Sequence, residues 1–417
     1  MVDLTLFVYL IVAWFSVICG YYVILAIASL IPQRNRLANG GKNKAKLLVV
    51  IPARNEENVI SDLVKDLEAQ DYDKDLFRVL VIVDHCDDKT EDAVKGASSG
   101  HTTVLVRNEG ERGKGATLDY GIAHASDVLP GFTFDSVAVF DADNRIGPGV
   151  VSAIARALSS GQQAVQIKVL AKNPDTSSLA RVQALESVVL QRVWQLGKDR
   201  LGLVSAFAGT GEAIKMDLLK QLGGFRNSLT DDLDLTIRMA DRGVRVKYLP
   251  DVITYDEKPD SLKVEMRRRV RWSAGHLSSL FKYGPRLITS KPTLLRIDAL
   301  FYLLAILTPL MLWGSYTIST LSWLGLATFS GMPIWVWIFL SGLWPSLVLI
   351  VPYLERQLGL YRAAPALFAF LLVWMIAVPA ALVKLARRDS NWSKTPHGIG
   401  INISAKEATR GQPVQYH

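Results

Sequence analysis

Residues 46–70 read KLLVVIPARNEENVISDLVKDLEAQ, an apolar strand followed by an amphipathic helix. Pro52 ends the apolar run, because proline lacks the N–H that a central strand needs, and apolar residues then recur at helical spacing. Four further apolar runs follow, at 78–84, 102–107, 136–141 and 163–170. Strands that alternate with helical patterns predict an α/β fold, in which a mostly parallel, doubly wound sheet has both faces covered.

The residues that follow these strands are polar, and ligands of parallel sheets bind at the carboxyl ends of the strands. ARNEE follows the first strand, DHCDDKT the second and DADN the fourth. A single acid at such a place is an ordinary turn or capping residue. In an extended segment, residues i and i+2 point the same way, so Asp141 and Asp143 of DAD could face one cation. Hard divalent ions bind carboxylates together with substrate phosphates, so a metal site and a capped turn both stay open.

Four later motifs carry groups suited to substrate chemistry. In GKG, at 113–115, Lys114 stands at a predicted helix start, where it suits an anionic ligand or is simply a solvated lysine. The glycines of AGTG, at 208–211, permit close approach of the backbone to a ligand. The acids of TDD, at 230–232, either cap a helix or place a general base near a reacting hydroxyl. MRRRVRW, at 266–272, gathers four arginines.

Apolar residues outside this domain form four blocks, each near the ~20 residues that cross a bilayer as a helix, at 4–31, 297–329, 334–351 and 363–385. The mean hydropathy is +0.21 and the net charge +8. The first block is too long for a signal peptide and lacks a basic start and a cleavage site. The basic segment after it, 33–46, contains no acid and predicts a cytoplasmic middle domain. Two cysteines exclude a disulfide framework, which fits a reducing compartment.

The blocks divide the chain into five expected segments. These are an N-terminal transmembrane helix at 1–33, a cytosolic α/β domain at 42–260, a basic segment with interfacial helices at 261–295, about three transmembrane blocks at 296–387 and a basic cytosolic tail at 388–417. One plus three spans would leave the tail outside, whereas its basic residues favour the cytoplasm. A broken or re-entrant helix around Pro309 would restore the parity. Within the domain, 180–202 predicts an amphipathic helix at the membrane interface or on the domain surface.

Along the chain, IPARNEE, Asp84 after a strand, GKG, DAD, AGTG, TDD and RRVRW form one ordered series. This series resembles the membrane-embedded family 2 glycosyltransferases, whose signature is written D, DxD, [TE]D and [QR]xxRW. That family includes cellulose, chitin, hyaluronan and poly-N-acetylglucosamine synthases and ceramide glucosyltransferases. The resemblance covers about residues 46–276 and the apolar blocks on both sides. It implies a Rossmann-like GT-A domain between transmembrane helices that uses a nucleotide-sugar donor, commonly UDP-linked, with Mg²⁺ or Mn²⁺, and inverts the anomeric centre in one displacement.

The resemblance also implies roles for single residues. The donor would be bound by Pro52, Arg54, Glu56, Asp84, Lys114, Asp141, Arg268 and Arg271, and its metal by Asp143. Asp232 would be the general base, with Asp231 beside it, and the acceptor would meet Trp272, Gly209, Thr210 and Gly211. A sugar hydroxyl is a poor nucleophile that needs such a base, and the departing diphosphate needs cations. Arg267 and Arg269 keep the plainer interpretation of contact with lipid headgroups or solvent.

Two departures from the signature bear on the substrate. TED is TDD here, which keeps the expected base but shortens its neighbour Asp231, and the Gln of QxxRW is Arg268, which weakens an inference to polymer synthesis. The balance still favours an extracellular or cell-surface β-linked polysaccharide, made by a multi-pass plasma-membrane enzyme. The alternative is transfer of one sugar to a membrane lipid; a transporter or receptor is remote, because the apolar blocks carry almost no charge. The expected partners are the donor, a carbohydrate or lipid acceptor and membrane lipids, without nucleic acid.

Overall fold

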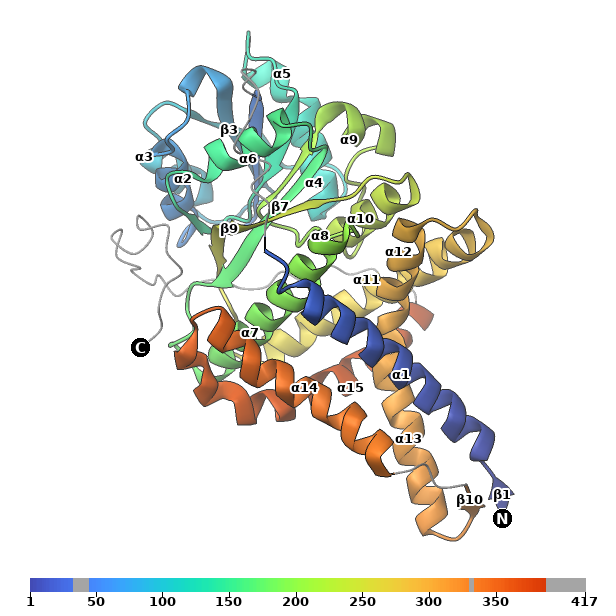
Figure 1. Cartoon of the computed structure of the whole chain (residues 1–417). Helices are drawn as coiled ribbons and strands as arrows, with labels where there is room; N and C mark the ends of the chain where they lie inside the picture. The colour runs from blue at the N-terminus through green and yellow to red at the C-terminus, as the bar shows by residue number, and fades with distance from the viewer. Residues whose placement is uncertain (33–44, 330–333, 388–417) are drawn as a thin grey trace.

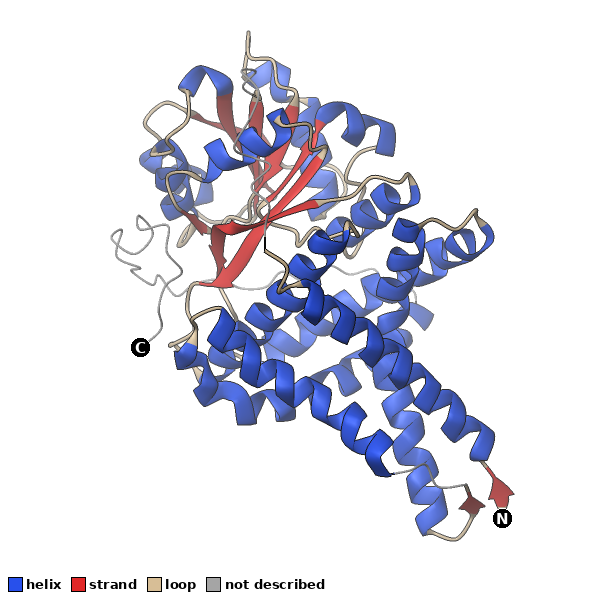
Figure 2. Cartoon of the chain, in the orientation of Figure 1, coloured by secondary structure: helices blue, strands red, loops and turns tan. Residues whose placement is uncertain are grey.

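The computed structural model describes residues 1–32, 45–329 and 334–387. An α/β domain forms one end of the molecule, and long helices from both ends of the chain gather at the other (Figure 1). Apart from a two-residue pair, β1 (Val2–Asp3) with β10 (Ala327–Thr328), the strands of the described residues lie in the α/β domain (Figure 2). The molecule therefore has one part built on a sheet and one part built on helices.

Eight strands form the main sheet, and most of them are parallel. β2 pairs in parallel with β3 and β5, β3 with β4, and β7 with β9, whereas β8 runs antiparallel to β5 and β7 and β6 runs antiparallel to β9. The predicted fold class is confirmed, with two strands reversed. In spatial order the strands are β4 (Thr102–Arg107), β3 (Phe77–Asp84), β2 (Leu47–Ala53), β5 (Ser136–Val139), β8 (Glu212–Lys215), β7 (Ala164–Ala171), β9 (Lys247–Asp256) and β6 (Arg145–Ile146).

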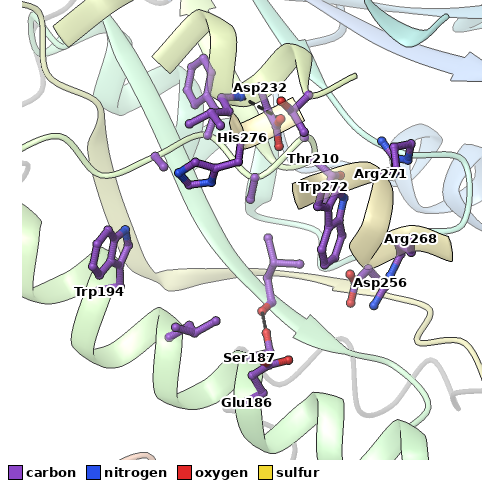
Figure 3. Close-up of a pocket in the computed structure, with 18 of the residues that line it drawn as sticks. Glu186, Ser187, Trp194, Thr210, Asp232, Asp256, Arg268, Arg271, Trp272 and His276 are labelled. Carbon is purple, nitrogen blue, oxygen red and sulfur yellow. Dashed lines mark hydrogen bonds between the residues drawn. The ribbon is translucent and has the colours of Figure 1, made fainter. Parts of the chain in front are cut away.

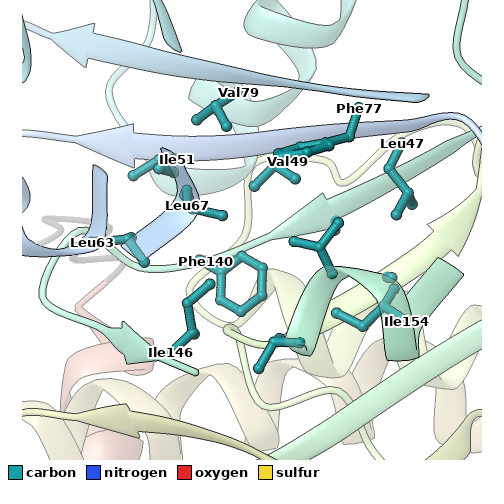
Figure 4. Packing of buried hydrophobic residues seen from close by; sticks show 14 of the residues in the cluster. Leu47, Val49, Ile51, Leu63, Leu67, Phe77, Val79, Phe140, Ile146 and Ile154 are labelled. Carbon is teal, nitrogen blue, oxygen red and sulfur yellow. The ribbon is translucent and has the colours of Figure 1, made fainter. Parts of the chain in front are cut away.

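Helices cover both faces of the sheet, because successive side chains of a strand point to opposite sides. In β2, Leu47, Val49 and Ile51 pack with α2 and α6 on one face (Figure 4), whereas Leu48 and Val50 pack with α4, α9 and α10 on the other. This double burial is what the continuous apolar runs predicted. The helices of the domain are α2 (Ile60–Glu68), α3 (Thr90–Ala97), α4 (Lys114–Ala123), α5 (Ala125–Val128), α6 (Val150–Ser159), α9 (Met216–Leu222) and α10 (Asp231–Asp241).

Strand direction brings the polar motifs to one edge of the sheet. Since β2, β3 and β5 are parallel, Arg54, Asp84 and Asp141 follow their strands at the same edge. The antiparallel β8 begins at that edge, with Glu212 opposite Val139. The AGTG turn, which immediately precedes β8, therefore lies beside the end of β5. A reversed strand thus adds a loop to the edge where parallel sheets bind ligands.

Three helical segments of the described residues are long and apolar enough to cross a membrane. They are α1 (Thr5–Ala28), Leu294–Trp323, which contains α12 (Leu294–Leu304) and α13 (Thr308–Trp323), and Leu358–Ala386, which contains α15 (Ala364–Ala386). A 3₁₀ segment, Ala305–Leu307, lies between α12 and α13 just before Pro309, with right-handed helical backbone on both sides of it, so a broken or re-entrant helix here stays a prediction. A further helix, α14 (Ile334–Leu354), lies near α1 (Figure 1). The number of crossings stays a prediction, and the basic tail lies outside the described residues.

The segment predicted as one amphipathic helix at 180–202 joins the two parts of the molecule. It forms α7 (Ser178–Leu190), a π-helical segment (Gln191–Leu196) and α8 (Gly197–Leu201). Its apolar side chains pack in one cluster with residues of α1, α14 and α15. The interpretation as a plain surface helix is therefore wrong.

Helix α11 (Leu262–Thr289) carries the MRRRVRW segment and packs along α15. Arg269 is only 1% exposed; its Nε donates to Glu265 Oε1 at 2.6 Å and its Nη1 to Glu186 Oε1 at 3.0 Å. Its guanidinium carbon lies 4.4 Å from the ring centroids of both Phe370 and Trp374 of α15. The expectation that Arg269 faces lipid headgroups or solvent is therefore wrong, since this residue ties α7, α11 and α15 together.

Replacing Arg269 by alanine should lower the free energy of unfolding by about 3–5 kcal/mol, because Glu186 and Glu265 would stay buried without their cation. Arg267→Ala, at an exposed position of the same helix, is the matched control, with an expected change within ~0.5 kcal/mol. Chemical denaturation of the detergent-solubilised protein measures both. Equal stability of the two variants would contradict the structural role of Arg269.

Candidate active site

One cavity of about 1000 Å³ runs from the carboxyl edge of the sheet into the helical part of the molecule. Its polar end collects nearly all the residues that the sequence singled out, and Figure 3 labels five of them, Thr210, Asp232, Arg268, Arg271 and Trp272. The residues collected there are Pro52, Arg54, Glu56, Asp84, Lys114, Asp141, Asp143, Gly209, Thr210, Asp231, Asp232, Arg268, Arg271 and Trp272. Gly211 does not line the cavity; a Cβ there would lie 2.6 Å from Ile167 Cγ1, so this glycine is required by packing inside the sheet.

The first two strand ends form one wall of the polar end. The backbone turns through the left-handed region at Asn55 (φ 55°) and His85 (φ 49°), which bends the chain sharply after β2 and after β3. Asp84 is 4% exposed and accepts hydrogen bonds from Arg107 Nη1 at 3.0 Å and Thr117 Oγ1 at 2.9 Å. These bonds fix the direction of a buried carboxylate at the carboxyl edge of the sheet, where it can accept hydrogen bonds from N–H or O–H groups of a ligand.

Arg107, which binds Asp84 but does not itself line the cavity, is a residue that sequence reasoning missed. It is the last residue of β4, and its guanidinium also donates to the Glu111 carbonyl at 2.6 Å. The signal was present, because Arg107 ends a predicted parallel strand. A single arginine at the end of a strand, however, belongs to no motif and predicts no function.

The glycines of GKG have a packing reason. A Cβ on Gly113 would lie 1.9 Å from Asn227 Oδ1, and one on Gly115 would lie 1.9 Å from the Arg226 carbonyl oxygen. Only glycine lets the start of α4 rest against this loop. Between them, Lys114 reaches into the cavity, where its Nζ donates to Asp141 Oδ1 and to the Gly209 carbonyl.

The charge of Lys114 is well compensated. Burial opposes the charge, but the negative groups Asp141, Asp231 and Glu212 outweigh burial and raise the pKa of Lys114. The lysine is therefore protonated over the whole physiological range. It is a fixed cation between three motifs, GKG, DAD and AGTG.

The two acids of DAD have different surroundings. Asp141 pairs with Lys114, whereas Asp143 Oδ2 accepts a hydrogen bond from the Glu257 backbone N–H at 3.0 Å. Asp256 is near Asp143. Burial raises the pKa of Asp256 most, the charge of Lys258 opposes the rise, and the charge of Asp143 adds to it. Asp141 therefore faces Lys114, whereas Asp143 lies near a further acid, Asp256.

These residues fit a divalent cation that also binds a phosphorylated ligand. Within the parts of the chain that the structure describes, no group of three or more His, Cys, Asp or Glu side chains is arranged to hold a metal. Asp256 Oδ1, however, is buried without a hydrogen-bond partner next to Asp143. Mg²⁺ commonly takes only one or two carboxylates and completes its shell with water and substrate phosphates, so this arrangement suits a cation that arrives with its donor.

The acids of TDD begin α10 and line the cavity, and both have raised pKa values. Asp232 Oδ1 accepts a hydrogen bond from the Leu233 N–H at 2.8 Å. Burial and then the charge of Asp231 raise the pKa of Asp232 to about 6, against the opposing charges of Lys114 and Arg271. Burial likewise raises the pKa of Asp231, whose Oδ2 is buried without a hydrogen-bond partner. A carboxylate with such a pKa is a good proton acceptor at neutral pH.

Arg271 and Trp272 reach this site from α11. Arg271 Nη1 donates to the Leu229 carbonyl at 3.0 Å, just before TDD. A Cβ on Gly275 would lie 2.4 Å from Thr230 Oγ1, so α11 packs tightly against TDD only because glycine is there. Arg268 pairs with Glu265 at 2.8 Å and lies 4.6 Å from the ring centroid of Trp272. The separate motifs TDD and RRVRW therefore form one structural unit.

Glu212 is a second residue that sequence reasoning missed. It is 1% exposed; its Oε2 accepts the Gly209 N–H at 3.0 Å, while its Oε1 is buried without a partner. Burial raises its pKa well above the usual value, and of the nearby charges Lys114 opposes the rise whereas Asp232 and Asp231 add to it. By accepting the Gly209 N–H, this carboxyl stabilises the AGTG turn. Its isolated place in a short strand gave no sequence signal.

The chain is similar to known glycosyltransferases. The family model described as "Glycosyltransferase like family 2" matches residues 45–275. The chain is 29% identical to the probable glycosyltransferase YdaM of Bacillus subtilis, over 63% of this chain and 62% of that protein, which is less than two thirds of its length. It is 25% identical to the beta-monoglucosyldiacylglycerol synthase of Synechocystis, over 85% and 75% of the two chains. It is 24% identical to a poly-beta-1,6-N-acetyl-D-glucosamine synthase of Staphylococcus aureus, over 53% and 52%.

A solved structure shows the same fold. The mannosyltransferase PcManGT from Pyrobaculum calidifontis, in complex with GDP-Man and Mn²⁺, superposes with a TM-score of 0.63 at 19% identity, covering 92% of this chain and 99% of that chain. The sheet, the edge on which the motifs meet and the match of the family model over more than half of the sequence lead to one conclusion. The chain belongs to the family 2 glycosyltransferases.

Proposed function

We propose that this protein transfers one sugar from a nucleotide-sugar donor to a hydroxyl group of a membrane lipid, with inversion at the anomeric carbon. The observation that carries the proposal is one continuous cavity, which has acidic and cationic side chains at one end and apolar side chains at the other. The apolar end is lined by residues of α1, α13 and α15 that we call the apolar chamber: Phe15, Ile18, Pro309, Leu312, Phe368, Leu371 and Met375.

The apolar chamber suits acyl chains better than a glycan. Alkyl groups gain free energy when they leave water for apolar surroundings. A sugar chain would lose hydrogen bonds to water there and would need polar groups in exchange. The chamber residues defined above offer none with their side chains. A lipid with its headgroup toward Asp232 and its chains in the chamber matches both ends of the cavity.

Asp232 is the proposed general base for the acceptor hydroxyl. In this role it takes the proton as the hydroxyl oxygen forms the new bond to the anomeric carbon and the diphosphate departs from the opposite face. Arg271 beside it would bind phosphate oxygens, which its planar guanidinium suits. Lys114 would offset the mutual repulsion of the acids of the site. No covalent sugar intermediate is required for inversion.

Asp143, together with its neighbour Asp256, is the proposed anchor of a Mg²⁺ or Mn²⁺ ion. When bound, such an ion would neutralise charge that builds on the leaving diphosphate. Asp84, with Pro52, Arg54 and Glu56, would accept the nucleoside. A UDP-linked donor remains our preference from the motif resemblance, and the named complex of the structural relative contains GDP-Man instead.

The proposed enzyme is a multi-pass protein of the plasma membrane with its catalytic domain in the cytosol. Support comes from the three apolar helical segments and from the basic flank at 33–46, which favours the cytoplasmic side. Nucleotide sugars would then reach the open polar end from the cytosol, and lipid would enter from the bilayer.

Synthesis of a β-linked polysaccharide is the second candidate, which the sequence taken alone favours. The name of the Staphylococcus aureus relative, a poly-beta-1,6-N-acetyl-D-glucosamine synthase, supports it. The name of the Synechocystis relative, a beta-monoglucosyldiacylglycerol synthase, supports lipid transfer, and the match to that relative covers more of this chain. The apolar chamber moves our preference to the lipid.

The product of the purified full-length protein separates the two candidates. In nanodiscs that contain diacylglycerol, with labelled UDP-sugars and Mn²⁺, we expect the label in a chloroform-soluble lipid that carries one sugar. Thin-layer chromatography and mass spectrometry identify that product. A labelled polymer of many sugars, with no labelled lipid, would contradict the proposal and favour the second candidate.

The pH profile tests the assigned base. Because Asp232 must be ionised, kcat/KM should fall about tenfold per pH unit below about pH 6 and stay level above it. Asp231→Asn removes a charge that raises the pKa of Asp232, so the acidic limb of the pH profile of this variant should shift to lower pH.

Asp232→Asn should abolish transfer while donor binding, measured by calorimetry, survives. Near-normal turnover of Asp232→Asn would contradict the assignment.

Gly209 offers a matched pair of variants. Its φ is +79°, and a Cβ there would lie 3.4 Å from Asp232 Oδ2 and 3.5 Å from Lys114 Nζ. Gly243 has nearly the same φ, +78°, with open space around it. Both alanine variants should lose similar stability, about 1 kcal/mol, but only Gly209→Ala should lose transfer activity, by at least tenfold. Similar activity losses would show that the turn has no special place in the site.

A further inference from the structure

Four aromatic side chains form a continuous wall in the middle of the cavity. Ring centroids are 5.4 Å apart for Tyr22 and Trp194, 5.2 Å for Trp194 and Tyr302, and 5.2 Å for Tyr302 and His276. All four residues line the cavity, and we call them the aromatic neck. His276 and Trp194 are visible on this side of the site in Figure 3.

The aromatic neck stands between the proposed base and the apolar chamber. Tyr302 is near enough to Asp232 to interact with it electrostatically. At the other side, Tyr22 follows Ile18 on α1 by one helical turn, and Ile18 belongs to the apolar chamber. An acceptor lipid with its chains in the chamber would therefore have its headgroup at the neck.

His276 presents a hydrogen-bond acceptor at this level. Its Nε2 lies 2.9 Å from the Tyr302 carbonyl oxygen, which can only accept, so Nε2 carries the proton. Burial lowers the pKa of His276 to about 4, so the ring is neutral and its Nδ1 is unprotonated. The Leu303 backbone is a second partner of the ring, but among the described residues no group donates to Nδ1, and His276 lines the cavity. A hydroxyl group of a ligand can donate to it.

The neck offers no available positive charge. Lys198 lies behind it, 4.1 Å from the Trp194 centroid and 4.7 Å from the Tyr302 centroid, but it is fully buried and its Nζ is 3.2 Å from Asp298 Oδ2. The cations Arg271 and Lys114 belong to the donor end. A phosphorylated headgroup would need charged donors at the neck, whereas an uncharged polyol headgroup would need an acceptor and ring faces.

We propose that the aromatic neck binds an uncharged, hydroxyl-bearing lipid headgroup, and that Nδ1 of His276 accepts a hydrogen bond from a hydroxyl that is not itself glycosylated. The inference rests on the proposed lipid transfer and adds the class of headgroup and a specificity residue. His276 thereby turns the headgroup so that the reacting hydroxyl faces Asp232.

The test uses the full-length protein in nanodiscs with the donor, Mn²⁺ and one of two acceptors, dioleoylglycerol or a polyprenyl phosphate. We expect transfer to dioleoylglycerol with a kcat/KM at least tenfold above that for the polyprenyl phosphate. His276→Ala should raise the KM for dioleoylglycerol about tenfold, the worth of one hydrogen bond of ~1.4 kcal/mol, and leave the donor KM unchanged. His276→Asn, which keeps an acceptor oxygen near the place of Nδ1, should restore most of the affinity.

His124→Ala is the matched control, since His124 lies on the domain outside the cavity and bonds to the Tyr120 carbonyl. An unchanged donor KM and melting temperature show that each variant is folded. A preference of the wild-type protein for the polyprenyl phosphate, or a normal dioleoylglycerol KM for His276→Ala, would overturn the headgroup inference while lipid transfer stands. If neither lipid is glycosylated and only a soluble glycan grows, the proposed function fails and this inference fails with it.

Discussion

The contact of Lys114 with Asp141 and the Gly209 carbonyl is the interaction on which the site depends. The carboxyl edge of the sheet brings several acids close together, where their mutual repulsion and the partial loss of hydration of their carboxylates would be unfavourable. Lys114 offsets this with one fixed charge that is shared among GKG, DAD and AGTG. The glycines that flank it, and the glycine that lets α11 approach TDD, are the backbone conditions for that arrangement.

A second constraint is the change of chemistry along the cavity. Its polar end holds ionised groups that need partners, and its apolar chamber holds groups that exclude water. A substrate that bridges the two must itself be amphipathic, which is why the cavity as a whole, and no single motif, points to a lipid acceptor. The buried network around Arg269 has a related part, because it fixes α15, a wall of the chamber, to α11, which carries Arg271 and Trp272.

The sequence predicted the fold class because continuous apolar runs indicate buried parallel strands. It predicted most of the residues that meet at the site because the polar residues that follow parallel strands lie at one edge of the sheet. It did not predict the reversed β8, whose four residues include the buried Glu212, or β9, which contains a proline and two acids. Arg269 and His276 were also missed as partners. Their roles depend on residues far away in the chain, Glu186 and Trp374 for one and Tyr302 for the other, and a local pattern carries no information about such pairs.

The most direct test of the account is a cryo-electron microscopy map of the protein in lipid nanodiscs with UDP and Mn²⁺. The account predicts density for UDP at Asp84 and Asp143 and, in the same cavity, density for a lipid whose headgroup lies at His276 and whose chains lie between Phe15, Leu312 and Phe368. A closed wall between the donor end and the chamber, or an extended glycan passing through the chamber, would contradict it.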